Sequence, residues 1–248
     1  MTLSWSFGHV TLQVFTNALY NLAANPQYAQ PLREEVEAIV EKEGWSKMSL
    51  GKMRKVDSFL KESTRIDGID ACQSLFPHLP VLIDIYFRFL VTLSRKAVKD
   101  FTFSDGTLIP KGTRINAGLV ALHHDGALYE NPELFDPFRF ADMGEDGDGA
   151  KHQFVSTSPG YLSFGHGLHA WYVSLSGTTV RVVLNFFFVS PGRFFAAAEL
   201  KMMLAHVVTT YDIKLEENIS RPRSLHIGNS IGANPTAKVM FRKRALLC

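Results

Sequence analysis

Three helical patterns follow one another at the start of the chain, and they restrict its fold more than any other feature. Apolar residues recur at near-helical spacing over 10–25, and this pattern stops at Asn25-Pro26, because the residue before a proline disfavours helical geometry. The second pattern covers 31–44 and the third covers 49–68, and each ends on a glycine. The first part of the chain is therefore predicted to be a series of helices joined by short turns.

The pattern changes after these helices. Residues 101–118 (FTFSDGTLIPKGTRINAG) alternate apolar and polar side chains around two turn sequences, one of which is Asp105-Gly106, so a small β-hairpin or meander is predicted. Helical spacing returns over 192–208, and three short stretches (YDIKL, LHIG and AKVMF) resemble closing strands. Together the patterns predict a mainly α protein with small β-sheets, of the α+β class.

The composition restricts the function more than the fold. The net charge is +2, and the charged residues are scattered, so the basic stripe that nucleic-acid binding needs is missing and no nucleic-acid partner is expected. The two cysteines, Cys72 and Cys248, are too few for a metal cluster and a poor basis for a disulfide framework. The apolar runs 76–91 and 180–189 are poor membrane spans, because the first carries charges and the second is too short.

Glu62 and Arg65 lie three residues apart in the third helical pattern. Such a pair taken alone is usually an ion pair on a helix surface, worth a few tenths of a kcal/mol. A different interpretation needs a third residue, and Arg139 in FDPFRF is a candidate. A buried carboxylate shared by two guanidinium groups would lock this helix to a distant loop.

A glycine-rich stretch, FGHGLHA, occupies 164–170, and PGRFFAAAELK begins at 191. Gly165 and Gly167 allow tight backbone turns under a flat ligand, and three consecutive alanines after the break allow a helix to pack closely. By itself a Gly-x-Gly sequence is weak, because many are plain turns. In combination with the other two motifs it is highly specific.

With these three motifs in place, the chain resembles the cytochrome P-450 haem-thiolate monooxygenases, and within them the fungal microsomal type. LKESTR resembles the family's Glu-x-x-Arg helix, FDPFRF resembles its Pro-x-Arg-Phe loop, and FTFSDGTLIPKGT resembles the hairpin between them. The resemblance implies a structural triad of Glu62, Arg65 and Arg139. It extends over nearly the whole chain, 1–248, as one partial domain that corresponds to the C-terminal half of the family's fold.

The resemblance also implies the haem-binding residues. FGHGLHA followed by PGRFFAAAELK resembles the family's haem signature in two pieces, so Phe164, Gly165, Gly167 and His169 would shape the haem pocket, with His169 near a propionate. The opening helix resembles the end of the long helix above the haem. Its usual proton-relay threonine corresponds to Val10 here, which makes the neighbouring Thr11 the candidate relay. His9 and Thr11 are equally explained as ordinary helix residues.

In function, the resemblance implies a monooxygenase that inserts one oxygen atom from O₂ into an apolar small molecule, with haem as cofactor and an NADPH-dependent reductase as electron source. Secondary metabolism of a terpenoid-like kind is the expected setting, and the endoplasmic reticulum membrane is the expected location of an intact parent. The resemblance implies that a full family member has an anchor and substrate-recognition helices ahead of the part that this chain resembles. The sequence therefore does not indicate a substrate.

One requirement of the family is missing. Its axial ligand is a cysteine thiolate, which donates electron density to iron, and that cysteine is expected at the junction of Ala170 and Pro191. This chain has Trp171 after Ala170 and Ser190 before Pro191, and neither can serve as the ligand. No metal ligand is therefore predicted among the residues present.

The genetic code suggests why. Trp171 is TGG, and the next two codons must read TAY-GTN, so the nucleotides after TG match a splice donor. A serine codon at 190 can follow an acceptor AG, and joining TG to its last nucleotide creates a cysteine codon. We hypothesise that 171–190 is a translated intron; a true insertion is the alternative. A second suspected insert covers 71–92 and contains Cys72.

Two predictions follow for the chain as it stands. The polypeptide with 171–190 in place is expected to have impaired monooxygenase activity or none, because it lacks the thiolate. The alternative from another class is a non-catalytic remnant, a helical interaction module without haem chemistry. The transcript discriminates between them: splicing of 171–190 favours an enzyme, and retention favours a remnant.

Overall fold

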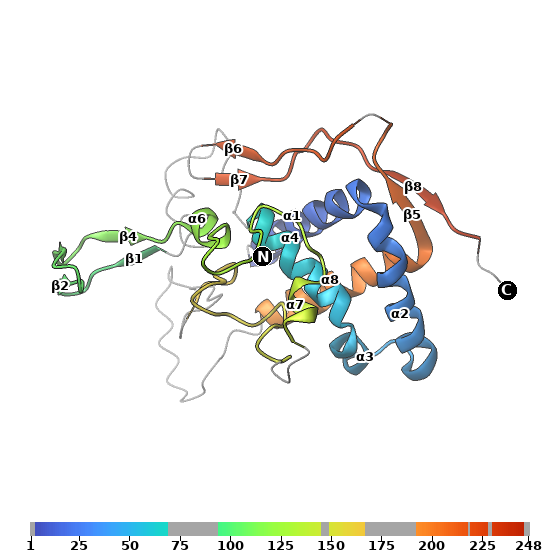
Figure 1. The fold of residues 1–248 in the computed structure, drawn as a ribbon, viewed down its shortest axis with the longest axis horizontal. Helices are drawn as coiled ribbons and strands as arrows, with labels where there is room; N and C mark the ends of the chain where they lie inside the picture. The colour runs from blue at the N-terminus through green and yellow to red at the C-terminus, as the bar shows by residue number, and fades with distance from the viewer. Residues whose placement is uncertain are drawn as a thin grey trace.

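A computed structural model describes residues 3–68, 94–144, 149–166, 192–217, 219–227 and 230–245. Its helices are α1 (Leu3–Ala24), α2 (Ala29–Glu43), α3 (Lys47–Lys52), α4 (Arg54–Asp67), α6 (Leu119–His123), α7 (Arg139–Asp142) and α8 (Gly192–Thr210), with a 3-10 turn at Pro26–Tyr28. Figure 1 shows α1, α2, α4 and α8 gathered in the body of the molecule. This arrangement confirms the predicted mainly α class with small sheets.

The strands form four separate two-stranded antiparallel pairs among the described residues. They are β1 (Ser94–Lys96) with β4 (Arg114–Asn116), β2 (Phe101–Thr102) with β3 (Leu108–Ile109), β5 (Tyr211–Lys214) with β8 (Met240–Lys243), and β6 (Leu225–Ile227) with β7 (Ser230–Gly232). The first two pairs make an arm that extends from the helical body (Figure 1). Its tip turns at Gly106, whose φ of 89° is one that glycine adopts freely, as the sequence predicted.

The third predicted helix is in fact two helices, so that prediction is corrected here. The N-cap is Ser46 rather than Ser49, because the two serines form a capping box in which each side chain bonds the other's backbone N–H. After the six residues of α3 the chain leaves helical geometry at Met53, whose ψ is 81° and whose side chain is fully buried. Helix α4 then starts afresh at Arg54.

The start of α4 is held by a neighbouring helix. No side chain of its own caps it, and instead the Glu35 carboxylate on α2 accepts hydrogen bonds from the backbone N–H groups of Lys55 (2.8 Å) and Val56 (3.0 Å). Partial burial raises the pKa of Glu35, and these backbone bonds act in the opposite direction. A carboxylate at a helix N-terminus also suits the helix dipole, so α2 fixes where α4 begins.

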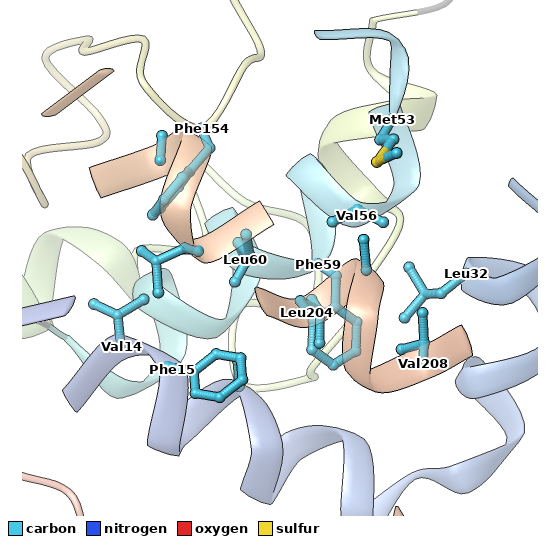
Figure 2. Close-up of a cluster of buried hydrophobic side chains, with 14 of the residues drawn as sticks. Val14, Phe15, Leu32, Met53, Val56, Phe59, Leu60, Phe154, Leu204 and Val208 are labelled. Carbon is cyan, nitrogen blue, oxygen red and sulfur yellow. The ribbon is translucent and has the colours of Figure 1, made fainter. Parts of the chain in front are cut away.

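The core lies where α1, α2, α4 and α8 meet. Figure 2 shows apolar side chains from all four helices converging, with Phe154 from the loop before the glycine-rich stretch at one side. Members with 2% exposure or less include Val14, Leu32, Val56, Phe59, Leu60, Phe154, Leu204 and Val208. Burying each such side chain is worth about 1.5–3 kcal/mol, which makes this cluster the main source of stability. Within the described ranges, no helix is both long and apolar enough to cross a membrane.

Candidate functional site

Helix α4 carries its polar side chains inside the protein. Glu62 and Arg65 have no exposed side-chain surface, and they form a bidentate pair with N–O distances of 2.7 and 2.8 Å. This arrangement excludes the surface ion pair that the spacing alone favours. Because a buried guanidinium needs several acceptors, Arg65 also donates to the carbonyls of His123 (2.5 Å), Pro132 (2.8 Å) and Leu134 (3.3 Å).

The structure brings Arg139 to the same carboxylate. Its Nε lies 3.2 Å from Oε1 of Glu62, which also accepts the backbone N–H of Asp136 at 3.1 Å. Arg139 begins the short helix α7 rather than lying in a loop, and it donates to the carbonyl of Glu130 at 2.6 Å. One carboxylate thus joins two guanidinium groups and holds the chain of 123–139 on α4. The role of the three residues as a structural triad remains a prediction.

The glycine-rich stretch is described as far as His166. Phe164 is 3% exposed, and its ring meets that of Phe154 at 4.9 Å, edge to face. Gly165 has a φ of 74°, a conformation that favours glycine, and His166 is exposed. Gly167, His169, the Ala170 and Pro191 junction, the insert 171–190 and the insert 71–92 lie outside the described residues.

An aromatic pair connects α4 to this stretch. Tyr161 is 1% exposed, its hydroxyl bonds the Thr64 hydroxyl on α4, and its ring stacks on His123 at 5.4 Å. His123 Nε2 accepts the backbone N–H of Leu162 at 3.1 Å. Burial, together with the nearby Arg65 charge, lowers the pKa of His123 to about 4, so the imidazole is neutral at physiological pH.

A second charged cluster on α4 was missed by the sequence analysis. Asp57 pairs with Lys201 of α8 at 2.7 Å, and Lys61 donates to the carbonyls of His152 (3.2 Å) and Gln153 (3.1 Å). The Nζ of Lys61 also lies over the rings of Phe140 and Tyr161, at 4.4 and 4.7 Å from their centroids. Burial lowers its pKa to about 8. One feature of the sequence could have indicated this cluster. Helix α4 has more charged residues than one solvent-facing side of a helix can hold, so some of them had to be buried.

The candidate relay residue belongs to α1. Thr11 on α1 is 7% exposed, as expected of an inward-facing residue. Two turns further along α1, Asn17 is 2% exposed, and neither of its amide atoms has a partner among the described residues. Asn21 donates to Asp67 of α4 at 2.9 Å and accepts from Arg221. Sequence reasoning missed this polar row on α1.

The residues present fit a haem framework only in part. The part that fits is the start of the glycine-rich stretch. Phe164 is buried there, the chain turns tightly at Gly165, and the chain before them is held on α4. The part that does not fit is the axial ligand of the haem iron. The axial ligand of this family is one cysteine thiolate, whereas this chain has Trp171 after Ala170 and Ser190 before Pro191. No chemical step through haem is derived for this chain.

Comparisons with known proteins identify what the chain is similar to. Residues 86–170 match the protein family described as Cytochrome P450. The chain is 44% identical over 237 residues to Cytochrome P450 monooxygenase 151 of Postia placenta, a match that covers 95% of this chain and 40% of the relative. It is 38% identical over 235 residues to Cytochrome P450 monooxygenase CYP512U6 of Ganoderma lucidum, covering 94% of this chain and 39% of the relative.

Among solved structures, the retinoic acid bound cyanobacterial CYP120A1 matches with a TM-score of 0.66 at 20% sequence identity. That match covers 96% of this chain and 43% of the solved chain, and at such low identity it concerns the fold alone. The chain therefore spans about two fifths of the length of the curated relatives that it matches.

Proposed function

This chain carries part of the cytochrome P450 fold and is related to fungal members of that family, and on this premise we propose that its parent is a haem-dependent monooxygenase. Such an enzyme inserts one oxygen atom from O₂ into an apolar small molecule and takes its electrons from an NADPH-dependent reductase. The observation that carries the proposal is the Glu62 carboxylate, fully buried between Arg65 and Arg139. It supports a proximal scaffold of the P450 type.

The finer parts of the proposal rest on the family resemblance. The substrate belongs to secondary metabolism of a terpenoid-like kind, and the intact parent works at the endoplasmic reticulum membrane. Phe164 and Gly165 would line the haem pocket together with Gly167 and His169, and Thr11 would relay protons. Haem in the parent would supply oxygen activation, while these residues bind and orient it.

The chain with 171–190 in place is proposed to have impaired monooxygenase activity or none. A thiolate is the ligand that this chemistry requires, and the indole of Trp171 has no lone pair free to coordinate iron. Joining Ala170 to Pro191 through one cysteine restores the ligand. The working protein is then the product of a spliced transcript.

Sequencing of cDNA across codons 160–200 in the source organism tests this proposal. The expected product joins Ala170 to a cysteine and then to Pro191. Retention of 171–190 in every transcript would overturn the splicing hypothesis and would favour the second candidate, a non-catalytic interaction module. The observation that favours that candidate is Trp171 at the ligand position.

A recombinant comparison tests the cofactor part separately. The 248-residue chain and a variant in which a single cysteine replaces 171–190 are each titrated with haem, and the absorption spectra of their reduced carbon monoxide complexes are recorded. We expect a thiolate-type spectrum only from the cysteine variant. A thiolate-type spectrum from the unaltered chain would contradict the assignment of Trp171 to the ligand position.

A further inference from the structure

Asp57 stands between two parts of the chain that are far apart in sequence. Its Oδ2 accepts the backbone N–H of Phe154 at 2.5 Å, and its Oδ1 lies 2.7 Å from the Nζ of Lys201. Phe154 precedes the glycine-rich stretch, and Lys201 lies on α8, the helix that follows it. Both flanks of the proposed haem-binding segment are therefore attached to one carboxylate on α4.

The flank before the segment is tied by more than one bond. Phe154 is fully buried, and its ring packs edge to face on that of Phe164, the first residue of the segment. Lys61, one turn beyond Asp57 on α4, holds the carbonyls of His152 and Gln153. Displacement of the Phe154 backbone would thus carry Phe164 with it, because the two rings share one close-packed site.

The charges in this cluster do not balance. Asp57, Lys61 and Lys201 are 7, 3 and 7% exposed, so one carboxylate serves two buried ammonium groups. Burial is the larger influence on Lys61 and lowers its pKa to about 8, while the Asp57 charge acts against it. Tyr161, the other titratable group facing Lys61, has a raised pKa through burial and stays neutral. Asp57 is therefore the group whose loss leaves two buried cations without an anion.

We propose that Asp57 is a positioning residue for the haem-binding segment, because its carboxylate joins the chain before that segment to the helix after it. This inference rests on the proposed function only where it says that the segment binds haem. The connection of Phe154 to Lys201 through Asp57 does not depend on that function. Its consequence is that the two flanks are set relative to each other before a cofactor binds. A rigid framework of this kind lowers the cost of ordering the site.

The test is residue-resolved amide hydrogen exchange on the 248-residue chain, with the amide of Phe154 as the reporter and that of Val36 on α2 as a reference for global opening. Asp57→Asn should speed exchange at Phe154 by about tenfold or more relative to Val36, because a charged hydrogen bond is lost. Lys201→Met should speed it by about threefold or more, because it removes the cation that binds the other oxygen of the Asp57 carboxylate. Combining both changes should add little beyond Asp57→Asn.

That non-additivity is the decisive result, because two independent contributions to stability would multiply instead. Lys214→Met, an exposed lysine on β5, is the matched control and should leave Phe154 unchanged. Three results would each overturn the proposal. Exchange could accelerate equally at Phe154 and Val36, the effects of the two changes could be independent, or Lys201→Met could behave like the control. If Asp57→Asn does not fold, Lys201→Arg is measured in its place. Because arginine keeps the positive charge, amide exchange at Phe154 should stay slow in Lys201→Arg, in contrast to Lys201→Met.

A second measurement follows the pKa of Lys61. Measured by side-chain NMR titration, the pKa of Lys61 should rise in Lys201→Met, where the Asp57 carboxylate has one cation fewer to serve, and should fall in Asp57→Asn. A pKa of Lys61 that moves in neither variant would overturn the coupling. None of these measurements involves haem, so a failure to bind haem counts against the proposed function alone.

Discussion

Single polar residues on α4 decide how the surrounding loops are placed. Buried charged groups there bind partners from other segments of the chain. Arg65, for example, pairs with Glu62 on its own helix and also donates to the carbonyls of His123, Pro132 and Leu134. Burial makes such a pair costly to form and more costly to break, because the remaining charge is left without a partner. The effect of a substitution is therefore asymmetric: removing one charge harms more than the pair itself contributes.

Glu62→Gln tests this asymmetry. It preserves the shape of the side chain but leaves Arg65 and Arg139 without their shared anion, so we expect a loss of about 3–5 kcal/mol in the free energy of unfolding. Urea denaturation followed by circular dichroism measures it. Glu43→Gln breaks the more exposed pair with Lys52 and should cost less than about 1 kcal/mol. Equal losses of unfolding free energy in the two variants would show that Glu62 contributes no more to stability than an exposed glutamate does.

At the scale of elements, α8 depends on small residues to approach its neighbours. Ala196 and Ala197 are 2 and 3% exposed, and α8 packs against α1, α2 and α4. The sequence predicts that three consecutive alanines serve this purpose, but Ala198 is only partly buried. Helical geometry explains the difference, since consecutive residues point about 100° apart and three in a row cannot face the same neighbour.

Ala197→Leu should therefore overpack this contact and cost about 1–3 kcal/mol in the free energy of unfolding, because a close-packed core cannot accept three more carbon atoms without moving. Ala198→Leu is the control with the same change in volume one position along. We expect the control to cost distinctly less in thermal or urea unfolding. A larger loss at Ala198 would mean that the other face of α8 makes the tight contact.

For the whole molecule, two buried bases make stability depend on pH. His123 has its pKa lowered from 6.5 to about 4, and Lys61 has its pKa lowered from 10.5 to about 8. In both cases the unfolded chain binds the proton more readily than the folded protein does. Stability contributed by each group is therefore present above the unfolded pKa and is lost as pH falls through the folded pKa.

We expect the free energy of unfolding to fall by about 3 kcal/mol through His123 alone as pH drops from 6.5 to 4, as a shift of this size implies. A rise with pH between about 8 and 10.5 is expected through Lys61. His123→Gln keeps an acceptor for the Leu162 N–H but does not titrate. The difference between wild type and this variant should shrink on acidification; parallel curves between pH 7 and 4 would contradict the assignment.

Part of the fold could be predicted from the sequence because the signals are local. Proline and glycine end the first helices, and Asp105-Gly106 turns the arm. The break at Met53 could not be predicted, because the cap that restarts α4 is Glu35 on another helix. The motif residues Glu62, Arg65 and Arg139 were selected by spacing and resemblance, whereas Asp57 and Lys61 belong to no motif.

The sequence by itself determined the first two helices, the last helix, the hairpin of the arm, the three motifs and the lack of a cysteine where an axial thiolate is needed, because these are properties of neighbouring residues. Only the tertiary structure decided that Glu62 is buried, that it serves two guanidinium groups, and that Asp57 joins Phe154 to Lys201. The physical reason is that burial and charge pairing depend on distances between segments far apart in the chain. A helix rich in charged residues has the same local pattern on a surface as in a core.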